Sequence, residues 1–195
     1  MPISRGSAWG APGRLPPDGV VVHSDGEASA LVERHRRAGE PVPAIGLLGG
    51  DLWRTLGGLG RLDITFPIDA VEARVDGERH WFVAHLVART RLWSYALVAM
   101  NAQWLGRWNT GPRAHPNDGL VDVYEARLPP GQRLAVRRRL HQGAHLPHLA
   151  ITERRTPETT VSFPRPLPVV VDGRRVGAAR ELALRVLPDA LTIVV

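Results

Sequence analysis

The segment from Asn101 to Val123 reads NAQWLGRWNTGPRAHPNDGLVDV and decides the fold of this chain. Its Pro-Asn-Asp-Gly sequence, which ends at Gly119, contains the residues that tight turns prefer. Apolar and polar residues then alternate from Leu120 to Ala126, which predicts a strand directly after the turn. A turn followed by a half-buried strand is typical of an antiparallel sheet.

Short strand-like segments surround this turn on both sides. Asp-Gly pairs at 76–77 and 172–173 are hairpin signals, and a helix is expected at 134–140. The other segments predicted as strands are 68–74, 81–87, 93–100, 149–153, 159–163, 167–171, 182–186 and 191–195. Many short strands at regular spacing indicate a β-sandwich or barrel-like domain.

The first third of the chain follows a different pattern. Short apolar strands are expected at 20–22 and 44–48, and each is followed by a helix, at 27–38 and 52–56. We therefore predict an α+β fold. Its three parts are an irregular Gly- and Pro-rich arm at 1–19, a small αβ unit at 20–62 and an antiparallel β-sandwich at 63–195.

Two residue types are missing, and their absence excludes several chemistries. The chain has no cysteine, which rules out disulfides, thiolate catalysis and cysteine-based zinc sites. All 25 basic residues are arginine, so a Walker A lysine, a Schiff base and a lysine general base are excluded as well.

The formal net charge of +6 favours phosphate-bearing partners such as nucleotides, anionic lipids or nucleic acid. The arginines are scattered, and the short cluster at 137–139 is typical of a solvated helix face, which argues against nucleic acid. No apolar run approaches the roughly 20 residues of a membrane helix, and the first residues contain no secretory signal. We expect a cytoplasmic protein, with peripheral attachment to a membrane as an alternative.

The central segment resembles the corresponding pattern of the bacterial diacylglycerol/lipid kinase family, whose catalytic domain has an NAD kinase-like fold. That pattern is Asn-Gly or Asn-Ala, a Gly-rich stretch, Pro, Asp-Gly and Leu-Asp-Val. The family's order continues with a basic helix, Gly143 with His145, the sequence Val171-Asp172-Gly173, and Leu187-Pro-Asp-Ala-Leu191 before a final valine-rich strand. The resemblance covers residues 66–195.

Two upstream segments resemble the family's nucleotide loops. The sequence from His23 to Glu27 is similar to Gly-Gly-Asp-Gly-Thr, and the sequence from Gly50 to Gly57 is similar to Asn-Asp-Leu-Ala-Arg-Leu-Gly. The resemblance implies ATP- and Mg²⁺-dependent phosphoryl transfer to a diacylglycerol-like lipid hydroxyl, with Asp172 as the catalytic base. It also implies nucleotide binding by Asp25, Gly26, Gly49, Gly50 and Arg54, and metal binding by Asp25, Asp51 and Asp118.

Departures from the family pattern favour a second function class, a non-catalytic relative that binds a lipid, a nucleotide or a protein partner. His23, Ser24 and Glu27 replace two glycines and the threonine of the phosphate loop, and Arg174 replaces an acidic residue. We hypothesise that a second copy of the chain or another subunit supplies nucleotide-binding elements. The four aspartates also have structural interpretations as helix caps or turn residues.

A third interpretation is a zinc hydrolase built on three histidines. His141, His145 and His148 are closely spaced, and imidazole is a common zinc ligand. Pro147 disrupts a regular helix, however, so this spacing does not place the three side chains on one helix face.

Overall fold

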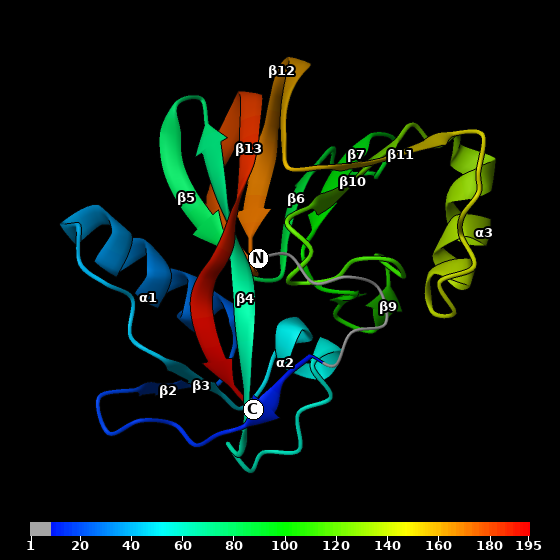
Figure 1. Cartoon of the computed structure of the whole chain (residues 1–195). Coiled ribbons are helices and arrows are strands. Elements are labelled where there is room, and N and C mark those ends of the chain that lie inside the picture. The colour runs from blue at the N-terminus through cyan, green and yellow to red at the C-terminus, as the bar shows by residue number, and fades with distance from the viewer. Residues whose placement is uncertain (1–8) are drawn as a thin grey trace.

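Antiparallel strands are the main secondary structure of the chain that the computed structural model describes, which is residues 9–195 (Figure 1). The main path through the large sheet runs β1-β4-β13-β12-β6-β7-β10-β11, and β5 pairs with β4 beside it. The bounds are β1 Ala11–Pro12, β4 Ile64–Val75, β5 Glu78–Phe82, β6 His85–Arg89, β7 Ala96–Met100, β10 Val121–Ala126, β11 Ile151–Thr156, β12 Glu158–Val171 and β13 Arg174–Val194. A separate pair is formed by β8 Trp104–Leu105 and β9 Trp108–Asn109.

A small αβ unit continues the same sheet. Strands β2 (Val20–Val22) and β3 (Ile45–Leu47) pair in parallel, and β3 also pairs in parallel with the end of β13. Helix α1 (Asp25–Ala38) connects the two strands, and the short helix α2 (Asp51–Thr55) follows β3. Helix α3 (Pro130–Leu140) lies apart from α1 and α2, beside β10 and β11 at the right of Figure 1.

Two hydrophobic cores correspond to these two parts. In the first core, side chains of β4 and β13 meet those of β7 and β10, and Phe82, Leu97 and Leu182 are completely buried there. The second core joins α1 and the parallel strands to β4 and the end of β13, around Ile45 and Ile193. Strand β13 therefore contributes to both cores.

The predicted α+β fold is confirmed, while several element boundaries differ from expectation. The segments expected at 159–163 and 167–171 form the single strand β12. Those at 182–186 and 191–195 form the single strand β13, and the residues between them make an irregularity in its register rather than a turn. Helix α3 begins at Pro130, four residues before the predicted start, because proline suits the first turn of a helix.

The strand predicted at 81–87 is two strands, because an aspartate from elsewhere interrupts it. β5 ends at Phe82 and β6 begins at His85. The backbone N–H groups of Val83, Ala84 and His85 all donate to the carboxylate of Asp172. The apolar run is continuous in the sequence, but these three backbone N–H groups donate to Asp172 instead of to a neighbouring strand.

The Asp-Gly loop at 118–119 is held in place by a buried carboxylate, that of Asp69 in β4. Its two oxygens accept hydrogen bonds from the backbone N–H of Gly119 at 2.7 Å and of Asp189 at 2.9 Å. One aspartate thus connects the loop after β9 to the irregular point of β13.

We expect Asp69→Ala to lower the free energy of unfolding by about 2–4 kcal/mol, because two backbone donors lose their buried acceptor. Urea denaturation measures the change, and the exposed Asp63→Ala serves as the matched control, with an expected effect within about 0.5 kcal/mol. Equal effects of the two substitutions would show that Asp69 does not hold the loop.

Candidate functional site

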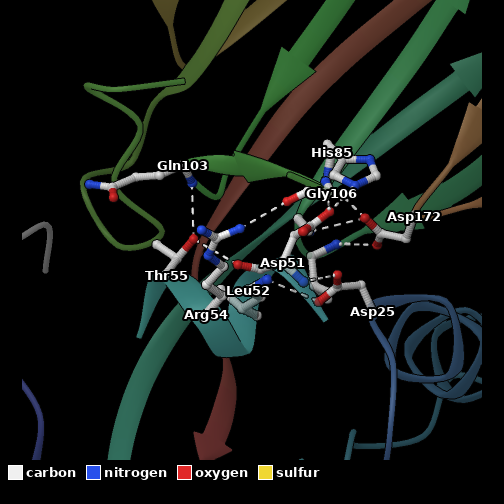
Figure 2. Close-up of polar contacts among 11 residues, drawn as sticks. Asp25, Asp51, Leu52, Arg54, Thr55, His85, Gln103, Gly106 and Asp172 are labelled. Atoms are coloured by element: carbon white, nitrogen blue, oxygen red, sulfur yellow. Dashed lines mark hydrogen bonds and ion pairs between the residues drawn. The ribbon is translucent and has the colours of Figure 1, made fainter. Parts of the chain in front are cut away.

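A cleft of about 670 Å³ opens where the starts of α1, α2 and β6 meet the turn between β12 and β13. Four acidic side chains line it, and they come from three separate segments of the chain. The lining residues that carry charge or can titrate are Asp25, Glu27, Asp51, His85, Asp172 and Arg174. Figure 2 shows Asp25, Asp51, His85 and Asp172 together in this region.

Asp25 is the first residue of α1 and reaches across to cap α2. Its carboxylate accepts the backbone N–H of Asp51 at 2.5 Å and of Leu52 at 3.1 Å. Gly50 permits this approach, since a Cβ at that position would lie 2.5 Å from the carboxylate. Burial raises the pKa of Asp25 to about 7, and the nearby negative charge of Asp172 adds to the increase.

Asp51 and His85 form a hydrogen-bonded pair at the centre of the cleft. The Nε2 atom of His85 lies 2.9 Å from Oδ2 of Asp51, which also accepts the backbone N–H of Gly106. Burial alone would raise the pKa of Asp51, but these hydrogen bonds outweigh it and lower the pKa. Burial alone would lower the pKa of His85, but the bond to Asp51 and the surrounding carboxylates raise it.

One potential cation site results from this arrangement. Ligand atoms of Asp25, Asp51 and His85 lie within 4.8 Å of one another, and no other such group of three occurs in the described part of the chain. Two carboxylates suit a hard divalent cation, whereas an imidazole favours ions such as Zn²⁺ or Ni²⁺. The donor set therefore fits a divalent cation in general rather than Mg²⁺ in particular.

Asp172 is buried at the wall of the cleft, and both of its carboxylate oxygens accept hydrogen bonds. It lies in the turn between β12 and β13 with φ of 45°, and its carboxylate accepts three backbone N–H groups at 2.8, 3.1 and 2.8 Å. Burial raises the pKa of Asp172. The same three bonds that hold the start of β6 occupy the atoms that a general base would use.

The N-terminus of α1 is closed by its own side chains. Ser24 Oγ accepts the backbone N–H of Glu27 at 3.2 Å, and the Glu27 carboxylate accepts the backbone N–H of His23 at 2.9 Å. This reciprocal pair resembles a capping box, although the glutamate accepts the N–H of His23 rather than that of the N-cap residue Ser24. The Glu27 carboxylate lines the cleft beside the first turn of α1, where its negative charge opposes the approach of a phosphate.

The structure brings most of the predicted site residues to this cleft: Asp25, Gly26 and Gly50 of the nucleotide set, the predicted metal ligand Asp51 and the predicted base Asp172. Arg54 stacks on the ring of Trp104 at 3.4 Å and donates to the Gly106 carbonyl. Gly49 lies against the carbonyl oxygen of His23, where a Cβ would come within 2.6 Å. Both residues position neighbouring loops.

Sequence reasoning missed His85, the residue that completes the cluster. Its only sequence signal was a polar residue inside an apolar run at 81–88. The pairing with Asp51 depends on the interruption of that run by Asp172, which could not be foreseen from the run itself.

Comparison with known protein families identifies the β-rich part of the chain. Residues 55–195 match the family described as the YegS C-terminal NAD kinase beta sandwich-like domain. The chain belongs to this family. The match covers the β-rich part, which carries His85 and Asp172, and leaves Asp25 and Asp51 outside it.

Solved structures show the same fold. A "putative diacylglycerol kinase" from Bacillus anthracis str. Sterne has a TM-score of 0.66 at 15% identity, over 91% of this chain and 78% of that chain. A structure described as a diacylglycerol kinase from the same organism gives 0.61 at 14% identity, over 91% and 76% of the two chains. A search among curated proteins found no match, and no helix among the described residues is long and apolar enough to cross a membrane.

Asp118 lies outside the cleft of this YegS-type domain. Its carboxylate pairs with Arg155, whose Nε also lies 2.7 Å from Oδ1 of the buried Asp122. Arg155 faces Asp122 directly in the ladder between β10 and β11. A guanidinium therefore neutralises the position where the resemblance implied a metal ion, and the predicted metal role of Asp118 gains no support. The three histidines of the zinc interpretation form no ligand group in the described residues.

Asp25 makes the stability of this domain depend on pH. Its pKa is raised from 3.8 to about 7 in the folded protein. As the pH rises, Asp25 therefore loses its proton at a lower pH in the unfolded chain than in the folded one. The contribution of protonated Asp25 is therefore complete below about pH 4 and is lost as the pH rises through about 7. We expect urea denaturation to show a fall in unfolding free energy across this window, of as much as about 4 kcal/mol.

The variant Asp25→Asn should show a flatter dependence on pH, whatever its absolute stability, while the exposed Asp18→Asn should keep the wild-type slope. Parallel slopes for all three proteins would contradict the assignment of this effect to Asp25.

Arg155→Ala should lower the free energy of unfolding by about 3 kcal/mol, because it leaves the buried Asp122 without its partner. Its exposed neighbour Arg154→Ala is the matched control and should change stability by less than about 0.5 kcal/mol. Thermal or urea denaturation distinguishes the two variants. A loss of stability in Arg155→Ala no larger than that in Arg154→Ala would show that the Arg155 guanidinium does not stabilise the fold.

Proposed function

We propose that this protein is a lipid-kinase-like protein that binds a neutral, hydroxyl-bearing lipid of the diacylglycerol class and does not transfer a phosphoryl group from a nucleotide. The observation that carries this proposal is the closed N-terminus of α1. The carboxylate of Glu27 occupies the backbone donor of His23 and repels any phosphate that approaches the same turn.

The state of Asp172 supports the loss of phosphoryl transfer. A general base must reach the hydroxyl that it deprotonates within hydrogen-bond distance. The carboxylate of Asp172 is buried and bound to three backbone donors. Arg174, which follows in the same turn, is paired with Glu33 at 3.1 Å.

Apolar hollows close to the cleft support the lipid. Leu105 lines both the acidic cleft and a narrow apolar cavity of about 70 Å³ against α3. That cavity shares Trp93, Trp108 and Leu140 with a wider groove of about 410 Å³ along α3. Apolar walls beside an acidic cleft suit a lipid whose polar end lies in the cleft.

The charge of the cleft favours a neutral lipid. Glu27 and Asp51 would repel an anionic headgroup, whereas carboxylates readily accept a hydrogen bond from a hydroxyl. A diacylglycerol-like molecule offers a free hydroxyl without a charge.

Phosphoryl transfer is the second candidate, and one observation favours it. Asp25, Asp51 and His85 lie close enough to hold a divalent cation in the cleft. For nucleotide binding, Glu27 would have to leave the α1 N-terminus, or a second copy or another subunit would have to supply the phosphate-binding groups.

Thermal unfolding with each ligand tests the proposal. A short-chain diacylglycerol at about 100 times its Kd should stabilise the fold by about 2.7 kcal/mol, which raises the midpoint by several degrees. Millimolar MgATP should leave the midpoint unchanged. Leu105→Glu should abolish the lipid shift, and the exposed Leu59→Glu is the matched control that should keep it.

Two outcomes would oppose this proposal. An unfolding midpoint that does not change with the lipid would exclude lipid binding in the cleft. A shift with MgATP that Asp51→Ala abolishes would establish the phosphotransferase candidate in its place.

A further inference from the structure

Helix α3, the turn at 90–95 and β9 enclose an apolar groove on the outer surface, which we call the α3 groove. Its volume is about 410 Å³, and its walls include Trp93, Trp108, Leu134 and Arg137. Two leucines at its margin face solvent, Leu92 with 71% and Leu134 with 57% of the side chain exposed. Exposed leucines that converge on one groove indicate an interaction surface.

Arginines surround these apolar side chains. Arg137 lies over the ring of Trp108 at 5.6 Å, and Arg89 lies over the ring of Trp93 at 4.4 Å. The last turn of α3 carries Arg137 together with two further exposed arginines at 138 and 139. Helix α3 has no acidic residue, and none of the residues that line the α3 groove is acidic.

We infer that the α3 groove docks the protein on the surface of an anionic phospholipid bilayer. Arginine binds phosphate oxygens, tryptophan is favoured at the boundary between headgroups and acyl chains, and exposed leucines at the margin can insert among the chains. Attraction between basic side chains and anionic lipids adds to this burial of apolar area. A nucleic acid would satisfy the arginines but would leave Leu92 and Leu134 in water.

This inference goes beyond the proposed function, because the α3 groove lies outside the acidic cleft and its docking needs no ligand there. Vesicle binding and lipid binding in the cleft can therefore fail independently. Leu105→Glu, which places a charge in the wall of the cleft, should leave vesicle binding intact.

Flotation of the full chain with large vesicles tests the docking. We expect binding to vesicles that contain phosphatidylglycerol, little binding to pure phosphatidylcholine, and a decrease at high salt. Arg133→Gln/Arg137→Gln should weaken partitioning by about 25-fold, at about fivefold for each arginine. Leu92→Ala/Leu134→Ala should weaken it by about tenfold or more.

Matched controls carry the same substitutions elsewhere on the surface. Arg165→Gln/Arg175→Gln removes two exposed arginines of β12 and β13, and Leu59→Ala removes another exposed leucine. Both should bind vesicles as the wild type does, and circular dichroism confirms that all variants are folded.

Several outcomes would overturn the inference. These are absence of binding to anionic vesicles, equal weakening in the control variants, and a dimer that the leucine variants dissociate in a protein that binds no vesicle. The last would assign the α3 groove to a second copy of the chain. Binding of the arginine-rich surface to nucleic acid in place of vesicles would likewise overturn it.

Discussion

The backbone hydrogen bonds of β13 are the constraint on which the rest of the structure depends. This strand of 21 residues pairs with β12 along its first half, with β4 from Leu182 onward, and with β3 in parallel at its end. One ladder therefore joins the β-sandwich to the αβ unit and places α1 beside the turn that contains Asp172. The parallel pairing at Ile193 and the ion pair between Arg174 and Glu33 together hold Asp25 near Asp172.

The acidic cleft shows how the fold accommodates several carboxylates close together. Asp25, Asp51 and Asp172 each accept backbone N–H groups, which compensates the loss of water around their charges. The repulsion that remains between these carboxylates adds to the effect of burial in raising the pKa of Asp25. Because these bonds connect α2, the β8–β9 turn and β6, the same carboxylates that would serve chemistry hold the walls of the cleft together.

The sequence predicted the parts of this structure that depend on local patterns. The strand after Gly119 follows from alternation, and the hairpin at 172–173 follows from its turn residues. The division of the run at 81–87, the pairing of His85 with Asp51 and the pairing of Arg155 with Asp122 depend on residues far apart in the chain. Since a lone aspartate looks the same as a cap, a turn residue or a metal ligand, only the fold distinguishes these roles.

The distribution of charge connects the cleft to the α3 groove. Acidic side chains line the cleft, and arginines line the α3 groove. Under the proposed function, an anionic lipid would gain energy at the arginines and lose it at the carboxylates, so it would be retained at the outer surface. A neutral lipid would meet no such barrier. The net charge of +6 thus conceals two regions of opposite sign, and this separation is the basis on which the proposed site would prefer a neutral lipid in an anionic membrane.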